Sequence, residues 1–98
     1  MSIERRAVDA KETGEALAAL PGWSLERGKL HKEFKFRDFR QAFGFMAGVA
    51  LIAESLDHHP DWSNVYNRVV IDLVTHDLGG ISTFDLEFAG RVEQMIRP

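Results

Sequence analysis

One nine-residue stretch marks the end of a helix and the start of the second half of the fold: Glu54-Ser55-Leu56-Asp57-His58-His59-Pro60-Asp61-Trp62. A proline disfavours the α conformation in the residue before it, so a helix running into this stretch should end at about His59. The helix dipole favours protonated imidazoles at a helix C-terminus, and Glu54 lies one turn before His58 on the same side. This cluster can therefore exchange protons near neutral pH.

The longest predicted helix precedes this stretch and spans about residues 39–57. Asp38-Phe39-Arg40-Gln41 has the pattern of an N-terminal capping box. Two apolar stripes follow the helix: Phe39, Phe43, Met46, Ala50 and Ala53 form one, and Phe45, Val49, Ile52 and Leu56 form the other. Together they exceed the ~100° face that a surface helix usually buries. One wide core face explains this pattern, and so does a core face plus a helix-to-helix contact between subunits.

Strand patterns flank the long helix on both sides. The four predicted strands span about residues 23–26, 30–36, 63–67 and 68–76. Each pair is separated by a tight turn, which predicts two β-hairpins. In the second strand Lys32 interrupts the apolar side and indicates a strand end or edge. In the last strand alternation places His76 on the same face as Val70 and Asp72.

Two shorter helices complete the pattern. Asp9-Ala10-Lys11-Glu12 and Ser82-Thr83-Phe84-Asp85 are capping boxes, which predict helices to about Leu20 and from residue 83 to the end. The element order is then α-β-β-α-β-β-α. We predict one α+β domain over residues 1–98, a four-stranded antiparallel sheet with three helices on one face.

Composition limits the classes of partner. The chain has 12 basic and 15 acidic residues, a net charge of −3 and no basic run, which disfavours nucleic acid as the main partner. No apolar run approaches the ~20 residues of a membrane span, and the N-terminus lacks the apolar core of a signal peptide. There is no cysteine, so disulfide and thiolate chemistry do not enter. We expect a soluble cytoplasmic protein.

Three of the four histidines lie at ends of predicted elements, where functional sites are usually assembled: His58, His59 and His76. Each taken singly is also explained as a surface histidine, as is His31 on the wet face of its strand. Three histidines can bind zinc, but here the spacing is poor. Adjacent histidines diverge, and no His-x-x-x-His pair puts two ligands on one helix face, so we predict no metal.

Other polar and aromatic residues near these histidines have two explanations each. Asp85 completes a capping box, and its carboxylate suits the helix dipole, so its spacing alone indicates a structural role. Glu54 is explained by a solvated helix position. Trp62 and Tyr66 fit the core, and they fit equally the walls of a flat pocket in which a ring system stacks.

The joint pattern resembles the pterin-4a-carbinolamine dehydratases, a family also known as the dimerization cofactor of a hepatocyte transcription factor. The family pattern has an acidic or polar residue, three positions, His-His-Pro, an aromatic residue, a histidine and an aspartate. Here it comprises Glu54, His58-His59-Pro60, Tyr66, His76 and Asp85. Family-like stretches elsewhere include Pro21-Gly22-Trp23, Phe43-Gly44-Phe45-Met46 and Asn64-Val65-Tyr66-Asn67. The resemblance covers nearly the whole chain from about residue 9.

The resemblance implies removal of water from 4a-hydroxytetrahydropterin to give quinonoid dihydropterin, which recycles the pterin cofactor (tetrahydrobiopterin) after aromatic amino-acid hydroxylation. It implies no bound cofactor, a homodimer or homotetramer, and a pterin-dependent hydroxylase in the same pathway. The residues implied as catalytic are His58, His59 and His76. The residues implied as substrate-binding are Glu54, Asp57, Pro60, Trp62 and Asp85.

Histidine suits this elimination, because one proton leaves ring nitrogen N5 and another goes to the departing 4a-hydroxyl. Its unperturbed pKa of ~6.5 keeps both protonation states populated near pH 7. Our hypothesis is that His59 chiefly holds the substrate while His58 and His76 exchange protons from either side. Two alternatives stay open: a pterin-binding protein of a folate or molybdopterin pathway, and a protein-binding transcriptional coactivator module.

Overall fold

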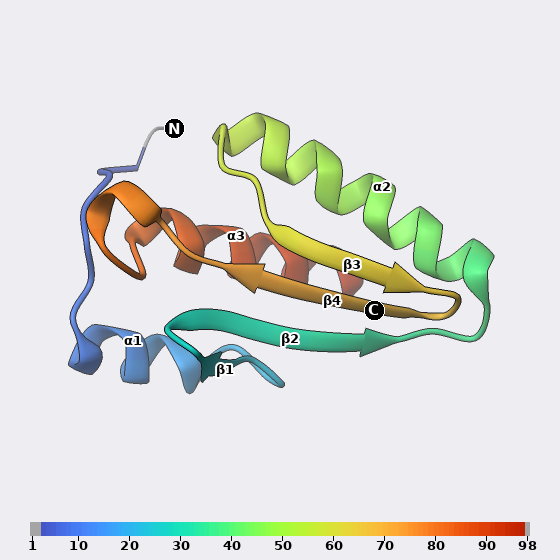
Figure 1. Cartoon of the computed structure of the whole chain (residues 1–98), viewed down its shortest axis with the longest axis horizontal. Helices are drawn as coiled ribbons and strands as arrows, with labels where there is room; N and C mark the ends of the chain where they lie inside the picture. The colour runs from blue at the N-terminus through green and yellow to red at the C-terminus, as the bar shows by residue number, and fades with distance from the viewer. Residues whose placement is uncertain (1–2, 98) are drawn as a thin grey trace.

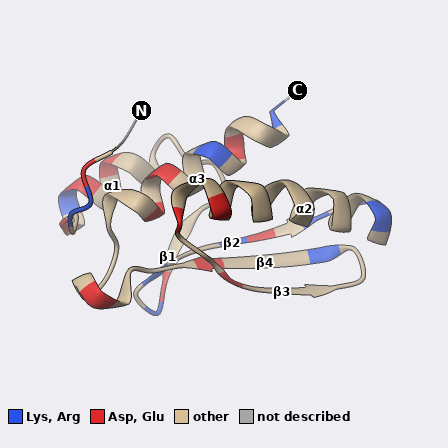
Figure 2. Cartoon of the chain, turned by 90° about the horizontal axis from the view of Figure 1, so that it is seen from above, with Lys and Arg blue, Asp and Glu red and all other residues tan. Residues whose placement is uncertain are grey.

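The computed structural model describes residues 3–97. Its elements in chain order are α1 (Ala10–Leu17), β1 (Ser24–Glu26), β2 (Lys29–Lys35), α2 (Phe39–Leu56), β3 (Asp61–Val65), β4 (Arg68–Leu73), the 3₁₀ helix η1 (His76–Leu78) and α3 (Thr83–Ile96). The strands form one antiparallel sheet in the order β1-β2-β4-β3, and the three α-helices lie on one of its faces (Figures 1 and 2). The predicted α+β fold is confirmed.

The strand order brings three loops to one end of the sheet. β2 pairs with β4 rather than with β3, so that Leu30 lies opposite Leu73, and His31 lies opposite Asp72. Asp61 at the start of β3 pairs with the same Asp72. The β1–β2 turn, the segment between α2 and β3, and the segment between β4 and α3 therefore meet at this end (Figure 1).

The core lies between the sheet and the helices. Side chains buried here include Leu30, Phe34, Val69, Ile71 and Leu73 from the sheet, Phe45 and Val49 from α2, and Phe88 and Val92 from α3. Full burial of such a side chain typically stabilises a fold by about 1.5–3 kcal/mol. Three residues of the second predicted stripe of α2, Phe45, Val49 and Leu56, are thus buried in this core. Other apolar residues of this helix stay exposed, namely Phe39, Phe43 and Leu51.

The second hairpin differs from the prediction at both ends. β3 begins at Asp61, directly after Pro60, and not near residue 63. β4 ends at Leu73, so the prediction that His76 continues a strand face was wrong. The reason is local: the N–H of Thr75 donates to the carbonyl of Gly80 at 2.8 Å, and this tight turn includes Gly79 in the left-handed region, at φ 78°.

The polarity of Lys32 predicted a strand end or edge, and this prediction was wrong. Lys32 pairs with Ile71 in the middle of β2 and points to the helix side of the sheet. Its Nζ lies 2.6 Å from a carboxylate oxygen of Glu93 on α3 and donates to the carbonyl of Pro21 at 2.7 Å. Trp23 Nε1 donates to the same Glu93 oxygen at 2.9 Å. A buried ion pair thus replaces the apolar contact that the strand pattern predicted.

The first helix is shorter than predicted. α1 ends at Leu17, whereas the sequence pattern extended it to Leu20. The chain leaves the helix before Pro21, a residue that disfavours helical conformation in its predecessor. Among residues 3–97, no helix is long and apolar enough to span a membrane.

Candidate active site

The end of α2 sends the two adjacent histidines in different directions. Asp57 caps the helix in the left-handed region, at φ 48° and ψ 44°, and the N–H of His58 donates to the carbonyl of Ala53 at 3.1 Å. The His58 side chain is buried, 10% exposed, whereas that of His59 is 59% exposed. His59 Nε2 lies 3.1 Å from Glu54 Oε1. The predicted divergence of the two imidazoles is present.

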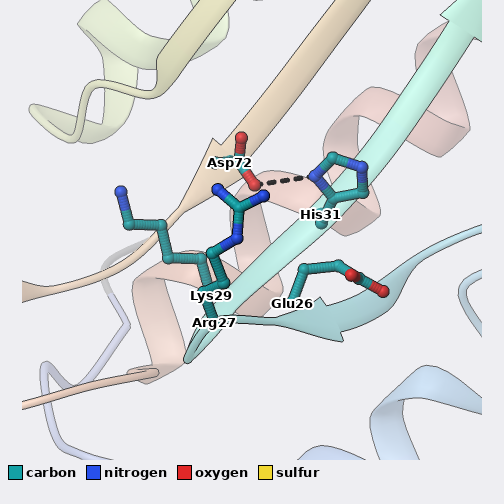
Figure 3. Close-up of a pocket in the computed structure, with 5 residues that line it drawn as sticks. All are labelled: Glu26, Arg27, Lys29, His31 and Asp72. Atoms are coloured by element: carbon teal, nitrogen blue, oxygen red, sulfur yellow. Dashed lines mark hydrogen bonds and ion pairs between the residues drawn. The ribbon is translucent and has the colours of Figure 1, made fainter.

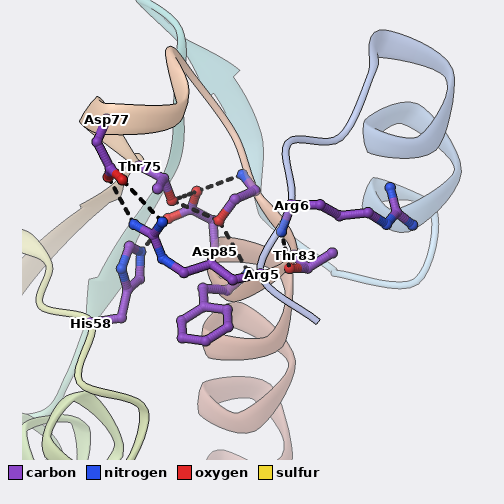
Figure 4. Close-up of polar contacts among 9 residues, drawn as sticks. Arg5, Arg6, His58, Thr75, Asp77, Thr83 and Asp85 are labelled. Carbon is purple, nitrogen blue, oxygen red and sulfur yellow. Dashed lines mark hydrogen bonds and ion pairs between the residues drawn. The ribbon is translucent and has the colours of Figure 1, made fainter. Parts of the chain in front are cut away.

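A buried carboxylate holds His58. His58 Nε2 lies 2.5 Å from Oδ1 of Asp85, which is fully buried (Figure 4). The other oxygen, Oδ2, accepts from the Thr75 hydroxyl and from the Ser82 N–H, both at 2.8 Å. An ionised carboxylate can only accept hydrogen bonds, so Nε2 of His58 carries the proton of its contact with Asp85, as the Thr75 hydroxyl and the Ser82 N–H do in theirs. Nδ1 is then the ring nitrogen that can accept a proton.

Hydroxyl and aromatic groups fix the geometry of this pair. The hydroxyls of Thr75 and Ser82 lie 2.6 Å apart, so Ser82 supports the Thr75 bond to the carboxylate. The rings of Phe84 and Phe88 meet the His58 ring edge to face, at centroid distances of 6.0 and 6.4 Å. Packing and hydrogen bonds therefore allow His58 little rotation.

The N-terminal segment fastens the turn that carries His76. The Arg5 guanidinium donates two hydrogen bonds to Asp77, at 2.7 and 2.9 Å, and stands 6.0 Å from the Phe84 ring centroid. The hydrogen bond from Arg5 lowers the pKa of Asp77, and the same hydrogen bond to the Asp77 carboxylate raises the pKa of Arg5. Thr83 donates its N–H to the Arg6 carbonyl at 3.0 Å. The N-terminal segment thus binds both η1 and the start of α3 (Figure 4).

His76 opens onto a hollow at the same end of the sheet. It begins η1 with an exposed side chain and borders a space of about 380 Å³. The other lining residues are Arg27, Gly28, Lys29, Val74, Gly79 and Gly80. A second hollow of about 240 Å³ adjoins the same β1–β2 turn and is lined by Glu26, Arg27, Lys29, His31 and Asp72 (Figure 3).

This arrangement matches a known family. The family model for pterin 4 alpha carbinolamine dehydratase matches residues 6–95, which include every histidine and Asp85. The chain belongs to the pterin-4a-carbinolamine dehydratase family. The family name describes lyases that act on a pterin.

Individual relatives agree with this assignment. A protein of Nitrobacter winogradskyi, described as a candidate pterin-4-alpha-carbinolamine dehydratase, is 47% identical over 97% of this chain and 94% of its own length. A protein of Synechococcus sp. (strain WH7803) with the same description is 53% identical over 78% of this chain and 82% of its own. The crystal structure of a transcriptional coactivator/pterin dehydratase from Brucella melitensis superposes with a TM-score of 0.86, at 44% identity, over 92% of this chain and 98% of that one.

The structure brings some of the predicted site residues together and separates others. His58 meets Asp85, and His59 meets Glu54. Tyr66 is 63% exposed in the β3–β4 turn, at the far end of β3 from the histidines, so it does not wall the same space.

The remaining positions implied by the family resemblance surround the end of α2. Asp57 is the exposed C-cap of that helix, and the half-buried Pro60 directly precedes β3. Trp62 is half-buried and packs against the hydrophobic core from β3, and its role in binding a substrate stays a prediction. Among residues 3–97, no three His, Cys, Asp or Glu side chains are grouped as a metal ion would require.

Sequence reasoning missed Arg5 and the Thr75 hydroxyl as parts of the site. Arg5 acts on a residue 72 positions away, and Thr75 on one 10 positions away. Neither spacing follows from the period of a helix or a strand. The proximity of Thr75 to His76 was the one available signal.

Proposed function

We propose that this protein dehydrates 4a-hydroxytetrahydropterin to quinonoid dihydropterin by histidine acid–base catalysis. The observation that carries the proposal is the His58–Asp85 pair, with its distance of 2.5 Å, in a chain of this family. A fully buried carboxylate that orients an imidazole is a recurring device for setting the proton-transfer nitrogen of a histidine.

The reaction requires two proton transfers and breaks one carbon–oxygen bond. A base removes the proton from N5, the N5–H electron pair forms the N5=C4a double bond, and the C4a–O bond breaks. An acid gives its proton to the departing hydroxyl, which leaves as water. The histidines take one proton from N5 and give one proton to the departing hydroxyl, so their total charge is unchanged after the reaction.

The geometry supports a division of roles among the three histidines. His58 presents Nδ1 from a fixed ring, which suits a group that exchanges protons at a defined position. His76 borders the hollow of about 380 Å³ from η1, and we assign it the role of the second proton-exchange group. His59, exposed beside Glu54, holds the substrate by hydrogen bonding. A positioned acid or base typically contributes about 10²–10⁴-fold to the rate.

The dehydration rate of 4a-hydroxytetrahydropterin, followed by ultraviolet absorbance with and without the protein, tests the proposal. We expect a clear acceleration that His58→Ala and His76→Ala each reduce by about 10²-fold or more. His31→Ala is the matched control, because its imidazole lies on the open face of the sheet and binds Asp72. His59→Ala should raise KM more than it lowers kcat.

Two outcomes would contradict these assignments. A larger effect of His59→Ala on kcat than on KM would overturn the substrate-holding role of His59. No acceleration by the folded wild-type protein would overturn the dehydratase proposal. It would favour a pterin-binding role in another pterin pathway, or the protein-binding role that the name of the Brucella melitensis structure includes.

A further inference from the structure

We propose that the hollow beside His76 binds a phosphate group on the pterin side chain, and that Arg27 recognises it. This inference rests on the proposed function, because it takes His76, which borders the hollow, as a residue that contacts the pterin ring. It adds a substrate class to that function: pterins whose side chain is phosphorylated.

The charges around the hollow carry this inference. Two cationic side chains, Arg27 and Lys29, border the same space as His76, and its lining contains no carboxylate. Its volume of about 380 Å³ is in the range of small-molecule pockets, about 300–1,000 Å³. The ring of 4a-hydroxytetrahydropterin has no negative charge for two cations to bind. A cationic hollow next to a proton-exchange histidine therefore suits an anionic extension of the substrate.

Arg27 is the cation that remains available. Lys29 Nζ lies 3.0 Å from Asp61 Oδ2, so a carboxylate already offsets its charge. The acidic residues near the second hollow also have partners: Glu26 accepts from the Ser24 hydroxyl at 3.2 Å, and Asp72 lies 2.8 Å from His31. Within residues 3–97, the Arg27 guanidinium makes no hydrogen bond or ion pair that would occupy it.

The backbone of the β1–β2 turn holds Arg27 in an uncommon conformation. The turn has two residues, since Glu26 pairs with Lys29, and both central residues have positive φ: 53° at Arg27 and 78° at Gly28. Such turns favour asparagine or glycine at the first position, and an arginine there is disfavoured. Tyr66 adopts the same conformation in the β3–β4 turn, at φ 51°, so this backbone conformation alone does not mark a site. Arg27 differs from Tyr66 because it carries a charge without a partner at the edge of the hollow.

The opposite wall of the hollow leaves room for a ligand. It includes Gly79 and Gly80, and a Cβ atom added at either glycine would meet no heavy atom within 4 Å. A guanidinium donates two parallel hydrogen bonds to a phosphate and is therefore suited to select it.

A pair of stable pterins tests the inference. Neopterin and neopterin monophosphate share the ring and the carbon side chain and differ by one phosphate. We expect the wild-type protein, titrated by pterin fluorescence at low salt, to bind the monophosphate about 10-fold more tightly or better. Raising the ionic strength to about 0.5 M should reduce this preference, because salt screens the charge pair.

Variants at position 27 assign the preference to the arginine. Arg27→Asn removes the charge and places a favoured residue in the turn, so it should fold and bind both pterins with similar affinity. Arg27→Lys should keep part of the preference. Arg40→Gln, which removes an exposed charge at the other end of α2, is the matched control and should keep all of it.

The outcomes separate this inference from the proposed function. Equal affinity of the wild-type protein for the two pterins, or a preference that survives in Arg27→Asn, would overturn the inference. Acceleration of the dehydration of an unphosphorylated substrate would leave the proposed function standing in either case. Failure to bind either pterin, together with no acceleration, would overturn both.

Discussion

Asp85 connects the local structure of α3 to the chemistry of His58. Its Oδ2 atom accepts from the Ser82 N–H and closes the capping box, and its Oδ1 atom faces His58. The spacing of Ser82 and Asp85 predicts the cap, and the cap is confirmed. The second function of the carboxylate depends on a residue 27 positions away and was left open by the spacing. One buried side chain therefore closes the capping box and contacts His58, which suits the positioning role that we propose for it.

Asp85→Asn separates these two roles. The amide oxygen must face the Ser82 N–H, because two donors would otherwise meet there, so the amide nitrogen faces His58 and donates to Nε2. His58 then carries its proton on Nδ1, so Nδ1 can no longer accept a proton from the substrate. We expect kcat to fall by about 10²-fold or more, since the tautomer is wrong. Steady-state kinetics measure this loss.

Thermal unfolding provides the control for that variant. All buried polar groups keep partners after Asp85→Asn, so Tm should change by only a few degrees. Asp85→Ala removes the carboxylate half of the capping box and the partner of His58, and it should lower both Tm and kcat. Wild-type kcat in Asp85→Asn would contradict the positioning role of the carboxylate.

At the scale of elements, a buried ion pair connects β2 to α3. Lys32 and Glu93 expose only 15% and 9% of their side chains, and Trp23 contributes a third polar contact. Removal of two charges from water costs free energy, which their mutual attraction and hydrogen bonds offset. The strand pattern did not predict this contact, because a lysine that faces a core requires a partner from a distant helix.

We therefore expect Lys32→Met alone to be more harmful than the double substitution Lys32→Met/Glu93→Gln. The single variant leaves the Glu93 carboxylate buried without its cation and should cost about 3 kcal/mol or more. Glutamine in the double variant keeps an acceptor for Trp23 Nε1 and removes the unpaired charge, so most of the loss should be recovered. Urea unfolding of the wild type, Lys32→Met, Glu93→Gln and the double variant measures the coupling free energy between the two residues. Purely additive losses would show that the pair has no such role.

At the scale of the whole molecule, α2 has an apolar face that the single chain does not cover. Leu51 is 73% exposed, Phe43 58% and Phe39 47%, while the opposite face of the helix is buried in the core. Gly44, Ala47 and Ala50 are also exposed on this helix and add little bulk, whereas Gly48 packs against Met95 of the same chain. The sequence offered one wide core face as an alternative, and the exposure of these three residues disfavours it. We propose that this face joins chains into a homodimer or homotetramer.

Leu51→Glu tests that assembly. A carboxylate on the exposed face should disrupt a helix-to-helix contact between chains and shift the protein to a smaller species. The fold should persist, because the side chain makes no core contact in the single chain. Sedimentation equilibrium measures the mass, with Leu51→Met as the control that retains an apolar side chain. The same mass for wild type and Leu51→Glu would rule out this face as the contact.

The sequence by itself determined the α+β order, the ends of α2, the capping boxes of α1 and α3, and the residue types of the site. These signals act between residues at most about four positions apart, through helix period, strand alternation and the restricted conformation before proline. Tertiary structure decided the placement of β4 beside β2, the burial of Lys32, and the position of His76 on a 3₁₀ turn. It also decided that His58 meets Asp85 and that Arg5 meets Asp77. Such contacts depend on how distant elements pack, which no local pattern encodes.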